Sequence, residues 1–156
     1  MKRIWVGACL AALAAALWLM AQPVGDPLVE GFRMVEVASV ADAMEQLYGQ
    51  RAYMSHEMRP VFKTKFAGPA VTVLLKKEEH KEGAAASAGM LDAIDNAKPG
   101  SVYVMVLDDG ADFAGIGGLM ATAMKYRGLA GAVIDASVRD TPQIEKELFS
   151  TENSNS

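Results

Sequence analysis

The sequence predicts an α/β fold with a partly parallel sheet. Three short segments are apolar and rich in β-branched residues, as buried strands are: 69–75 (PAVTVLL), 101–107 (SVYVMVL) and 130–135 (AGAVID). Segments with helical spacing separate them, and strands that alternate with helices are typical of parallel layers. With 156 residues, the chain is long enough for one domain with a real core.

The N-terminal segment is predicted to be a secretory signal peptide. Residues 4–21 form an uncharged apolar run directly after Lys2 and Arg3, and Ala21 is a small residue of the kind found at cleavage sites. A run of this length is also just enough for an uncleaved membrane anchor, which is the alternative interpretation. In both cases we expect residues 1–22 to place the domain outside the cytoplasm, in the periplasm or another extracytoplasmic space.

Composition excludes several classes of function. The chain has one cysteine, Cys9, and it lies inside the N-terminal apolar run, so the exported domain would have no disulfide and no cysteine-bound zinc. The whole chain has 15 basic and 19 acidic side chains, and this excess of negative charge argues against a nucleic-acid binder. The two histidines, His56 and His80, are far apart and have no partner at metal-ligand spacing, so surface or structural roles are expected.

The chain before the first strand is predicted to hold one helix. Residues 22–38 contain two prolines and are expected to be an extended lead-in. The segment 39–49 (SVADAMEQLYG) has helical apolar spacing, with Ser39 as the predicted cap and Gly49 as the end. Residues 50–68 are polar and irregular, which predicts a loop that leads into the strand 69–75.

Two further helices and two loops are predicted between and after the other strands. Residues 76–89 carry mixed charges and are expected to form a solvated loop, followed by a short helix at 90–97 that ends at Lys98–Gly100. The Gly- and Asp-rich segment 108–118 predicts a loop, and 119–128 (LMATAMKYRG) predicts a helix.

A candidate site is predicted from two short motifs. Gly117 and Gly118 stand where a loop enters a helix, and helix N-terminal N–H groups can bind a carboxylate, although flexible glycines alone often serve only the loop. Arg139 and Asp140 follow the strand 130–135, beyond whose carboxyl end ligands gather in parallel sheets. Arg can bind a carboxylate through two hydrogen bonds and Asp can ligate Mg²⁺, but a surface ion pair is the alternative.

Together these motifs resemble the RraA family, which includes 4-hydroxy-4-methyl-2-oxoglutarate aldolases and the regulator of ribonuclease E activity. The resemblance lies in "GGLMATAMKYRGLAGAVIDASVRD" (117–140), with "FAGPAVTV" (66–73) matching an early strand and "SVADAMEQL" (39–47) a first helix. It covers roughly residues 34–147. It implies an RraA-like α/β/β sandwich, often assembled as a homotrimer or hexamer with sites between subunits.

The resemblance also implies a reaction and its residues. The enzyme would be a lyase that cleaves 4-hydroxy-2-oxo acids to pyruvate with a divalent metal cation, Mg²⁺ or Mn²⁺, and oxaloacetate decarboxylation would be a second activity. Arg139 would bind the substrate and Asp140 would ligate the metal, so these two are the implied catalytic side chains. The substrate carboxylate would lie on the backbone of four residues: Gly117, Gly118, Leu119 and Met120.

The sequence departs from the family pattern at four points. Gly118 and Gln143 stand where family members often have acidic residues, and Ala136 replaces a glycine before Arg139. After 139–147 the sequence does not continue with the family's next strand, which suggests a chain that is truncated and lacks C-terminal strands. An inactive family member is therefore one alternative function, and a protein-binding regulator of the ribonuclease E inhibitor type is another.

The expected domain organisation has three parts. Residues 1–22 are the signal peptide or anchor, 27–148 the RraA-like domain, and 149–156 a polar, disordered tail. The expected partner is a small 2-oxo acid, without nucleic acid. Contact with a membrane is expected only through an uncleaved N-terminal segment.

Overall fold

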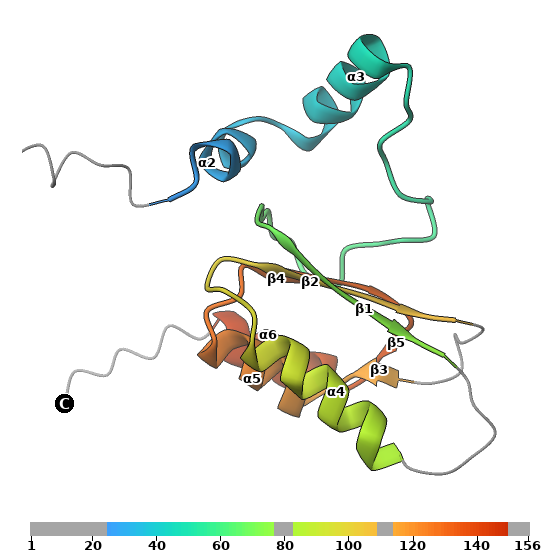
Figure 1. The fold of residues 1–156 in the computed structure, drawn as a ribbon, viewed down its shortest axis with the longest axis vertical. Coiled ribbons are helices and arrows are strands. Elements are labelled where there is room, and N and C mark those ends of the chain that lie inside the picture. Colours follow the sequence, from blue (N-terminus) through green and yellow to red (C-terminus); the bar gives the residue numbers. More distant parts are fainter. Residues whose placement is uncertain (1–24, 77–82, 109–113, 150–156) are drawn as a thin grey trace, which may run out of the picture.

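The computed structural model describes residues 25–76, 83–108 and 114–149 (Figure 1). The predicted α/β class is confirmed. Three strands form a parallel sheet in the order β1-β2-β4, with bounds Ala70–Leu75, Val102–Leu107 and Gly131–Asp135. The predicted signal peptide or anchor at 1–22 and the tail residues after Phe149 lie outside the described residues.

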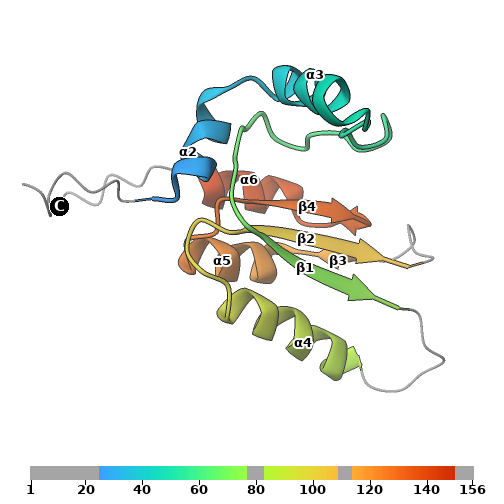
Figure 2. The same cartoon turned by 45° about the horizontal axis from the view of Figure 1, so that its top comes forward.

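One face of the sheet packs against helices and forms the core. Side chains alternate between the faces of a strand, and the register places Val73, Met105 and Ile134 side by side on the inner face. Helices α4 (Gly83–Asp95) and α5 (Gly118–Tyr126) cover this face (Figures 1 and 2). The buried centre of the core consists of Ile94, Tyr103, Met105, Ile116 and Met124.

The opposite, outer face of the sheet remains partly open within the described part of the chain. Leu74 on β1 is 59% exposed and Val106 on β2 is 38% exposed. The prediction that 69–75 is a buried strand was therefore wrong for alternate residues. The physical reason is that helices α4 and α5 cover only the inner face, so the outer side chains of β1 face away from α4.

A second, two-stranded sheet extends the fold toward the C-terminal helix. β3 (Ala114–Ile116) pairs in parallel with β5 (Ser137–Val138), and α6 (Thr141–Phe149) follows and packs against α5. The sequence places β3 in the predicted loop 108–118 and predicts no element at β5, because strands of two or three residues leave almost no alternating pattern. Phe149, which the sequence placed in the tail, is the last residue of α6.

The N-terminal helices differ from their prediction. The expected extended segment contains α2 (Pro27–Met34), whose first turn is capped because the Leu28 N–H donates to Asp26 Oδ1 at 2.9 Å. α3 (Val37–Tyr48) begins before Ser39, the predicted cap, and ends as predicted at Gly49 in the left-handed conformation.

The remaining boundaries follow local composition. α4 begins at Gly83, inside the predicted loop 76–89, because the alanine-rich stretch after the charges favours a helix. The predicted loop at 50–68 contains no helix or strand. In the described ranges, no helix combines the length and apolarity needed to span a bilayer.

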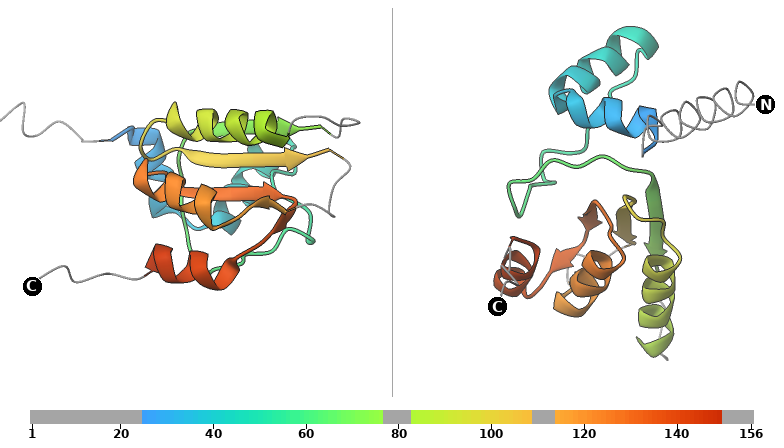
Figure 3. Two further views of the ribbon diagram at one scale, coloured as in Figure 1. Left: turned by 90° about the horizontal axis from the view of Figure 1, so that it is seen from below. Right: turned by 90° about the vertical axis from the view of Figure 1, so that its left-hand side faces the viewer.

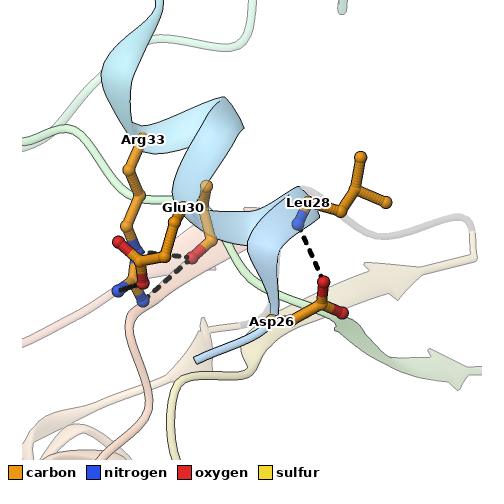
Figure 4. A network of polar contacts seen from close by, with 5 residues as sticks. Asp26, Leu28, Glu30 and Arg33 are labelled. Carbon is orange, nitrogen blue, oxygen red and sulfur yellow. Dashed lines mark hydrogen bonds and ion pairs between the residues drawn. The ribbon is translucent and has the colours of Figure 1, made fainter. Parts of the chain in front are cut away.

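Helices α2 and α3 form an arm, residues 25–49, on the other side of the sheet from α4 and α5 (Figures 1 and 3). Arg33 ties this arm to the loop that precedes β1. Its Nε and Nη2 each donate to the carbonyl of Ala67 at 3.3 Å, and its Nη1 pairs with Glu30 Oε1 at 2.8 Å (Figure 4). Neither helix of the arm buries a side chain.

Candidate functional site

The glycine pair and the Arg-Asp pair meet in the structure. Gly117 follows β3 and is the N-cap of α5, while Arg139 and Asp140 lie between β5 and α6. Pairing of β3 with β5 sets Ile116 beside Val138, and the Arg139 N–H donates to the Ile116 carbonyl at 3.1 Å. The short second sheet therefore joins two motifs that are 22 residues apart in the sequence.

Asp140 is the link between the two helices of the site. Its Oδ2 accepts the N–H of Gly118 at 3.1 Å, so its carboxylate caps α5, which has no cap from its own N-cap residue. Its carbonyl accepts the Ile144 N–H at 3.0 Å and begins α6. Asp140 adopts φ 61°, the left-handed region that Asp tolerates better than most residues.

Arg139 lies beside the same carboxylate but faces solvent. Its Nε is 3.5 Å from Asp140 Oδ2, and the side chains are 74% and 43% exposed. At this exposure the pair contributes little to stability. An exposed guanidinium next to a helix N-terminus can instead bind a small anion, because both carry positive charge and N–H donors.

Any side chain at position 117 would have to displace Arg139 and Asp140. A Cβ on Gly117 would lie 2.8 Å from both Arg139 Nε and Asp140 Oδ2, closer than van der Waals contact allows. The chain thus brings its backbone directly against the two charged side chains. This contact supports the prediction that the glycines belong to the site and do not only loosen a loop.

Gly118 has a different neighbour. A Cβ at this position would lie 3.1 Å from Cδ and Oε1 of Gln143, so the carboxamide fills the space into which a side chain at 118 would project. Both positions depart from the family pattern, and the structure shows that the two departures are in contact. Sequence reasoning named Gln143 but could not place it.

Some of the backbone groups that are predicted to bind the substrate carboxylate already make hydrogen bonds within the protein. The Gly118 N–H donates to Asp140, and the Ala121 N–H to the Gly117 carbonyl at 3.1 Å. Leu119 and Met120 occupy the second and third positions of α5, where N–H groups have no carbonyl of the same helix to bond. Thr122, which sequence reasoning missed, donates through Oγ1 to the Gly118 carbonyl at 2.9 Å.

The donor set suits Mg²⁺ better than zinc. Among residues 25–76, 83–108 and 114–149, no three side chains of His, Cys, Asp or Glu gather in a metal-binding group. Mg²⁺ keeps several waters and binds through one or two carboxylates plus substrate oxygens, so Asp140 with a chelating substrate fits that pattern. His56 is exposed, and His80 lies outside the described residues.

The family model described as RraA-like (Aldolase/RraA) matches residues 37–154. The chain therefore belongs to the RraA-like family, as the resemblance of its motifs predicts. Family members include aldolases as well as non-catalytic regulators.

Solved structures share this fold. RraAS2 of Streptomyces coelicolor, described as an unusual member of the RNase ES inhibitor RraA protein family, is 25% identical, with a TM-score of 0.62 over 78% of this chain and 60% of that one. An uncharacterized protein from Pseudomonas syringae pv. tomato is 23% identical, with a TM-score of 0.63 over 79% and 53%.

A third solved structure, described among novel cellulases from microbes associated with the gut ecosystem, is 21% identical, with a TM-score of 0.65 over 78% of this chain and 55% of that one. At these identities the last two show a shared fold alone. The chain spans between 53% and 60% of the length of these three proteins.

Proposed function

We propose that this member of the RraA-like family is a divalent-metal-dependent lyase that cleaves 4-hydroxy-2-oxo acids, such as 4-hydroxy-4-methyl-2-oxoglutarate, to pyruvate. Decarboxylation of oxaloacetate is its second activity in this proposal. The observation that carries the proposal is the meeting of Gly117 and Gly118 with Arg139 and Asp140, where Asp140 Oδ2 lies 3.1 Å from the Gly118 nitrogen.

Each of these residues has a role in the proposed reaction. Arg139 binds a substrate carboxylate, because its exposed guanidinium offers paired donors. The first-turn N–H groups of Leu119 and Met120 face the same substrate from the N-terminus of α5. Asp140 holds the metal cation while its Oδ2 stays fixed by the Gly118 N–H.

The barrier to the reaction is negative charge on the pyruvate enolate that leaves when the carbon–carbon bond breaks. A bound divalent cation would supply Lewis-acid stabilisation of that charge. Arg139 and the positive end of the α5 dipole stabilise the same charge from the protein side. Loss of CO₂ from oxaloacetate gives the same enolate, which is why one site can serve both reactions.

Assembly and location complete the proposal. We propose that the chain functions as a homo-oligomer, as a trimer or hexamer, with residues 1–22 directing it out of the cytoplasm. Oligomerisation is known within the family. The site described above is open to solvent at Arg139, so a neighbouring subunit can approach it.

A second candidate is a protein-binding regulator. It is favoured by the likeness to RraAS2, which is described as a member of an RNase ES inhibitor family. In that case the exposed arm or Arg139 would contact a protein partner and the chain would release no pyruvate. A family member without activity is the third possibility, because Gly118 and Gln143 replace acidic residues.

The test is metal-dependent pyruvate release. The full chain is incubated with oxaloacetate or 4-hydroxy-4-methyl-2-oxoglutarate and Mg²⁺, and pyruvate is followed through lactate dehydrogenase. We expect release that stops with EDTA and falls about 100-fold or more in Asp140→Asn, because one carboxylate ligand is lost. The matched control Asp42→Asn, on exposed α3, keeps full activity.

Two outcomes contradict the lyase. One is the absence of pyruvate with Mg²⁺, Mn²⁺ or other divalent cations, from wild-type chain whose circular dichroism shows it to be folded. The other is unchanged release in Asp140→Asn. Capture of ribonuclease E by the same inactive but folded chain would support the regulator.

A further inference from the structure

We propose that Gln143 determines which substrates the site accepts. Its carboxamide binds the second carboxylate of a 2-oxo dicarboxylic acid, the one farther from the 2-oxo group. Arg139 and the N-terminus of α5 bind the first carboxylate, beside the 2-oxo group. This inference rests on the proposed function and names the residue that selects the class of substrate.

The first argument is the orientation of the Gln143 carboxamide. A Cβ on Gly118 would lie 3.1 Å from Gln143 Cδ, 3.1 Å from its Oε1 and 3.2 Å from its Nε2. Three nearly equal distances mean that the flat carboxamide presents its face to Gly118. Its N–H groups lie in the plane of the amide, so they point past Gly118 and not at it. Gln143 is exposed, so an anion from solvent can approach the carboxamide.

The second argument is the position of Gln143 relative to the other polar groups of the site. The Gly118 N–H donates to Asp140 Oδ2 at 3.1 Å, so the residue that Gln143 covers also holds the proposed metal ligand. Arg139 lies against the preceding residue, because a Cβ on Gly117 would be 2.8 Å from Arg139 Nε. A guanidinium therefore borders one glycine and a carboxamide the next, with Asp140 in contact with both. A substrate held at Asp140 can meet Arg139 with one end and Gln143 with the other.

The third argument is that Gly118 makes room for Gln143. Gly118 lies in α5 and is not one of the glycines with positive φ, so its backbone conformation would accept a side chain. The carboxamide of Gln143 occupies the space into which that side chain would project. The glycine at 118 and the long polar side chain at 143 thus belong to one arrangement.

The chemistry of a carboxamide suits a second carboxylate. A carboxamide has two N–H donors and no charge, and a hydrogen bond to a charged acceptor is stronger than one to a neutral acceptor. An acidic side chain at 118 or 143 would instead repel the second carboxylate of the substrate. A 2-oxo acid that lacks this carboxylate offers Gln143 no charged acceptor. The site is therefore expected to prefer 2-oxo dicarboxylic acids to monocarboxylic ones.

The experiment measures binding of two unreactive acids to the full chain by isothermal titration calorimetry, with Mg²⁺ present and in a mild nonionic detergent. The probes are 2-oxoglutarate and 2-oxopentanoate, which share one carbon chain and differ in the second carboxylate. Both lack the 4-hydroxyl group and the β-carboxylate on which the proposed reactions act. Gln143→Met removes the hydrogen bonds at similar length, and Gln143→Glu replaces the donors with negative charge. The matched control is Gln46→Glu, on exposed α3.

We expect the wild-type chain and Gln46→Glu to bind 2-oxoglutarate about tenfold more tightly than 2-oxopentanoate, because a hydrogen bond to a charged group contributes about that factor. Gln143→Met should bind the two acids about equally, since it loses the donors without a change of charge. Gln143→Glu should weaken 2-oxoglutarate about tenfold or more, because two carboxylates then face each other. Circular dichroism checks that each variant is folded.

The failures of the two proposals can be told apart, because binding and pyruvate release are measured separately. A folded wild-type chain that binds the two acids equally, or binds neither, overturns the role of Gln143 even where pyruvate is released. A preference for 2-oxoglutarate that persists in Gln143→Met overturns it as well. A chain that shows the expected preference but releases no pyruvate supports this role of Gln143 and contradicts the lyase.

Discussion

The site region and the arm form their helices by similar local rules but are held by different forces. The site region, β3 to α6, buries Ile116, Met124 and Ile144. The arm has a well-formed cap at Asp26 and a left-handed end at Gly49, yet neither of its helices has a fully buried residue. Local signals are thus enough to place a helix, whereas its stability depends on packing.

The largest contrast should appear when one apolar side chain is shortened in each region. Ile144 on α6 is 4% exposed and Leu47 on α3 is 73% exposed. Ile144→Ala should lower the free energy of unfolding by about 2–5 kcal/mol, because it removes buried area and leaves a cavity. Leu47→Ala should change it by less than about 0.5 kcal/mol.

Urea unfolding followed by circular dichroism measures both variants, at a concentration low enough to separate copies. Equal losses for the two variants would mean that the arm packs within its own chain.

The second contrast concerns two aspartates that cap helices. Asp140 caps α5 from 22 residues further along the chain, through a part-buried hydrogen bond. Asp26 caps α2 from the adjacent N-cap position, through an exposed hydrogen bond. Asp140→Ala should cost about 1–2 kcal/mol, because it loses the cap and strains a residue at φ 61°. Asp26→Ala should cost about 0.5 kcal/mol.

Asp140→Asn is the informative control, measured by thermal unfolding beside the alanine variants. Asn accepts the Gly118 N–H and tolerates positive φ, so it should keep most of the stability while losing the charge. A loss as large as that of Asp140→Ala would show that the charge of Asp140, and not its hydrogen bond, stabilises α5.

The difference between the regions also explains what the sequence could predict. The strands at 69–75, 101–107 and 130–135 were found because apolar, β-branched runs are a strong local signal. The sequence analysis predicts an extended segment in place of α2 because it counts the prolines at 22–38 as signs of extended chain, although a proline directly after a capping Asp is a helix start. That signal was present in the sequence.

The residues of the candidate site could be named from the sequence, but their contacts could not. The spacing of the glycine pair and the Arg-Asp pair pointed to one site, and the structure joins them. The Gly118–Asp140 hydrogen bond depends on β3 and β5, two strands too short to leave a pattern, and on the left-handed conformation of Asp140. The contact between Gly118 and Gln143 is likewise set by the packing of α5 on α6.

A third contrast compares two glycines. Gly117→Ala would place its Cβ 2.8 Å from Arg139 Nε and Asp140 Oδ2, so both side chains must move. In the proposed lyase this should lower kcat/KM about tenfold or more, because the misplaced groups no longer meet the substrate. Gly31→Ala in α2 has nothing within 4 Å and should stabilise the helix by about 0.5–1 kcal/mol.

Pyruvate release and thermal unfolding, measured on both glycine variants, test this contrast. The Gly31→Ala chain should have unchanged activity, which controls for a general effect of the substitution. Full activity in Gly117→Ala would mean that Arg139 and Asp140 do not need the close backbone approach seen here.

The smallest contrast is expected at high pH, between two tyrosines. Burial raises the pKa of Tyr103 above its ordinary value of 10.0, because the charged phenolate would lose its water. A raised pKa in the folded chain means that the folded state binds the proton more tightly than the unfolded state. This stabilisation is complete below pH 10 and is lost as the pH rises toward the folded pKa.

Tyr103→Phe removes this titration, whereas Tyr48→Phe, a control on the exposed arm, leaves Tyr103 in place. Between pH 9 and pH 11, the free energy of unfolding should therefore fall less steeply in Tyr103→Phe than in the wild type, while Tyr48→Phe follows the wild type. Urea unfolding at several pH values gives the three slopes. Parallel slopes in all three chains would show that water reaches the Tyr103 hydroxyl, and that the core beneath the site is less closed than that of a packed domain.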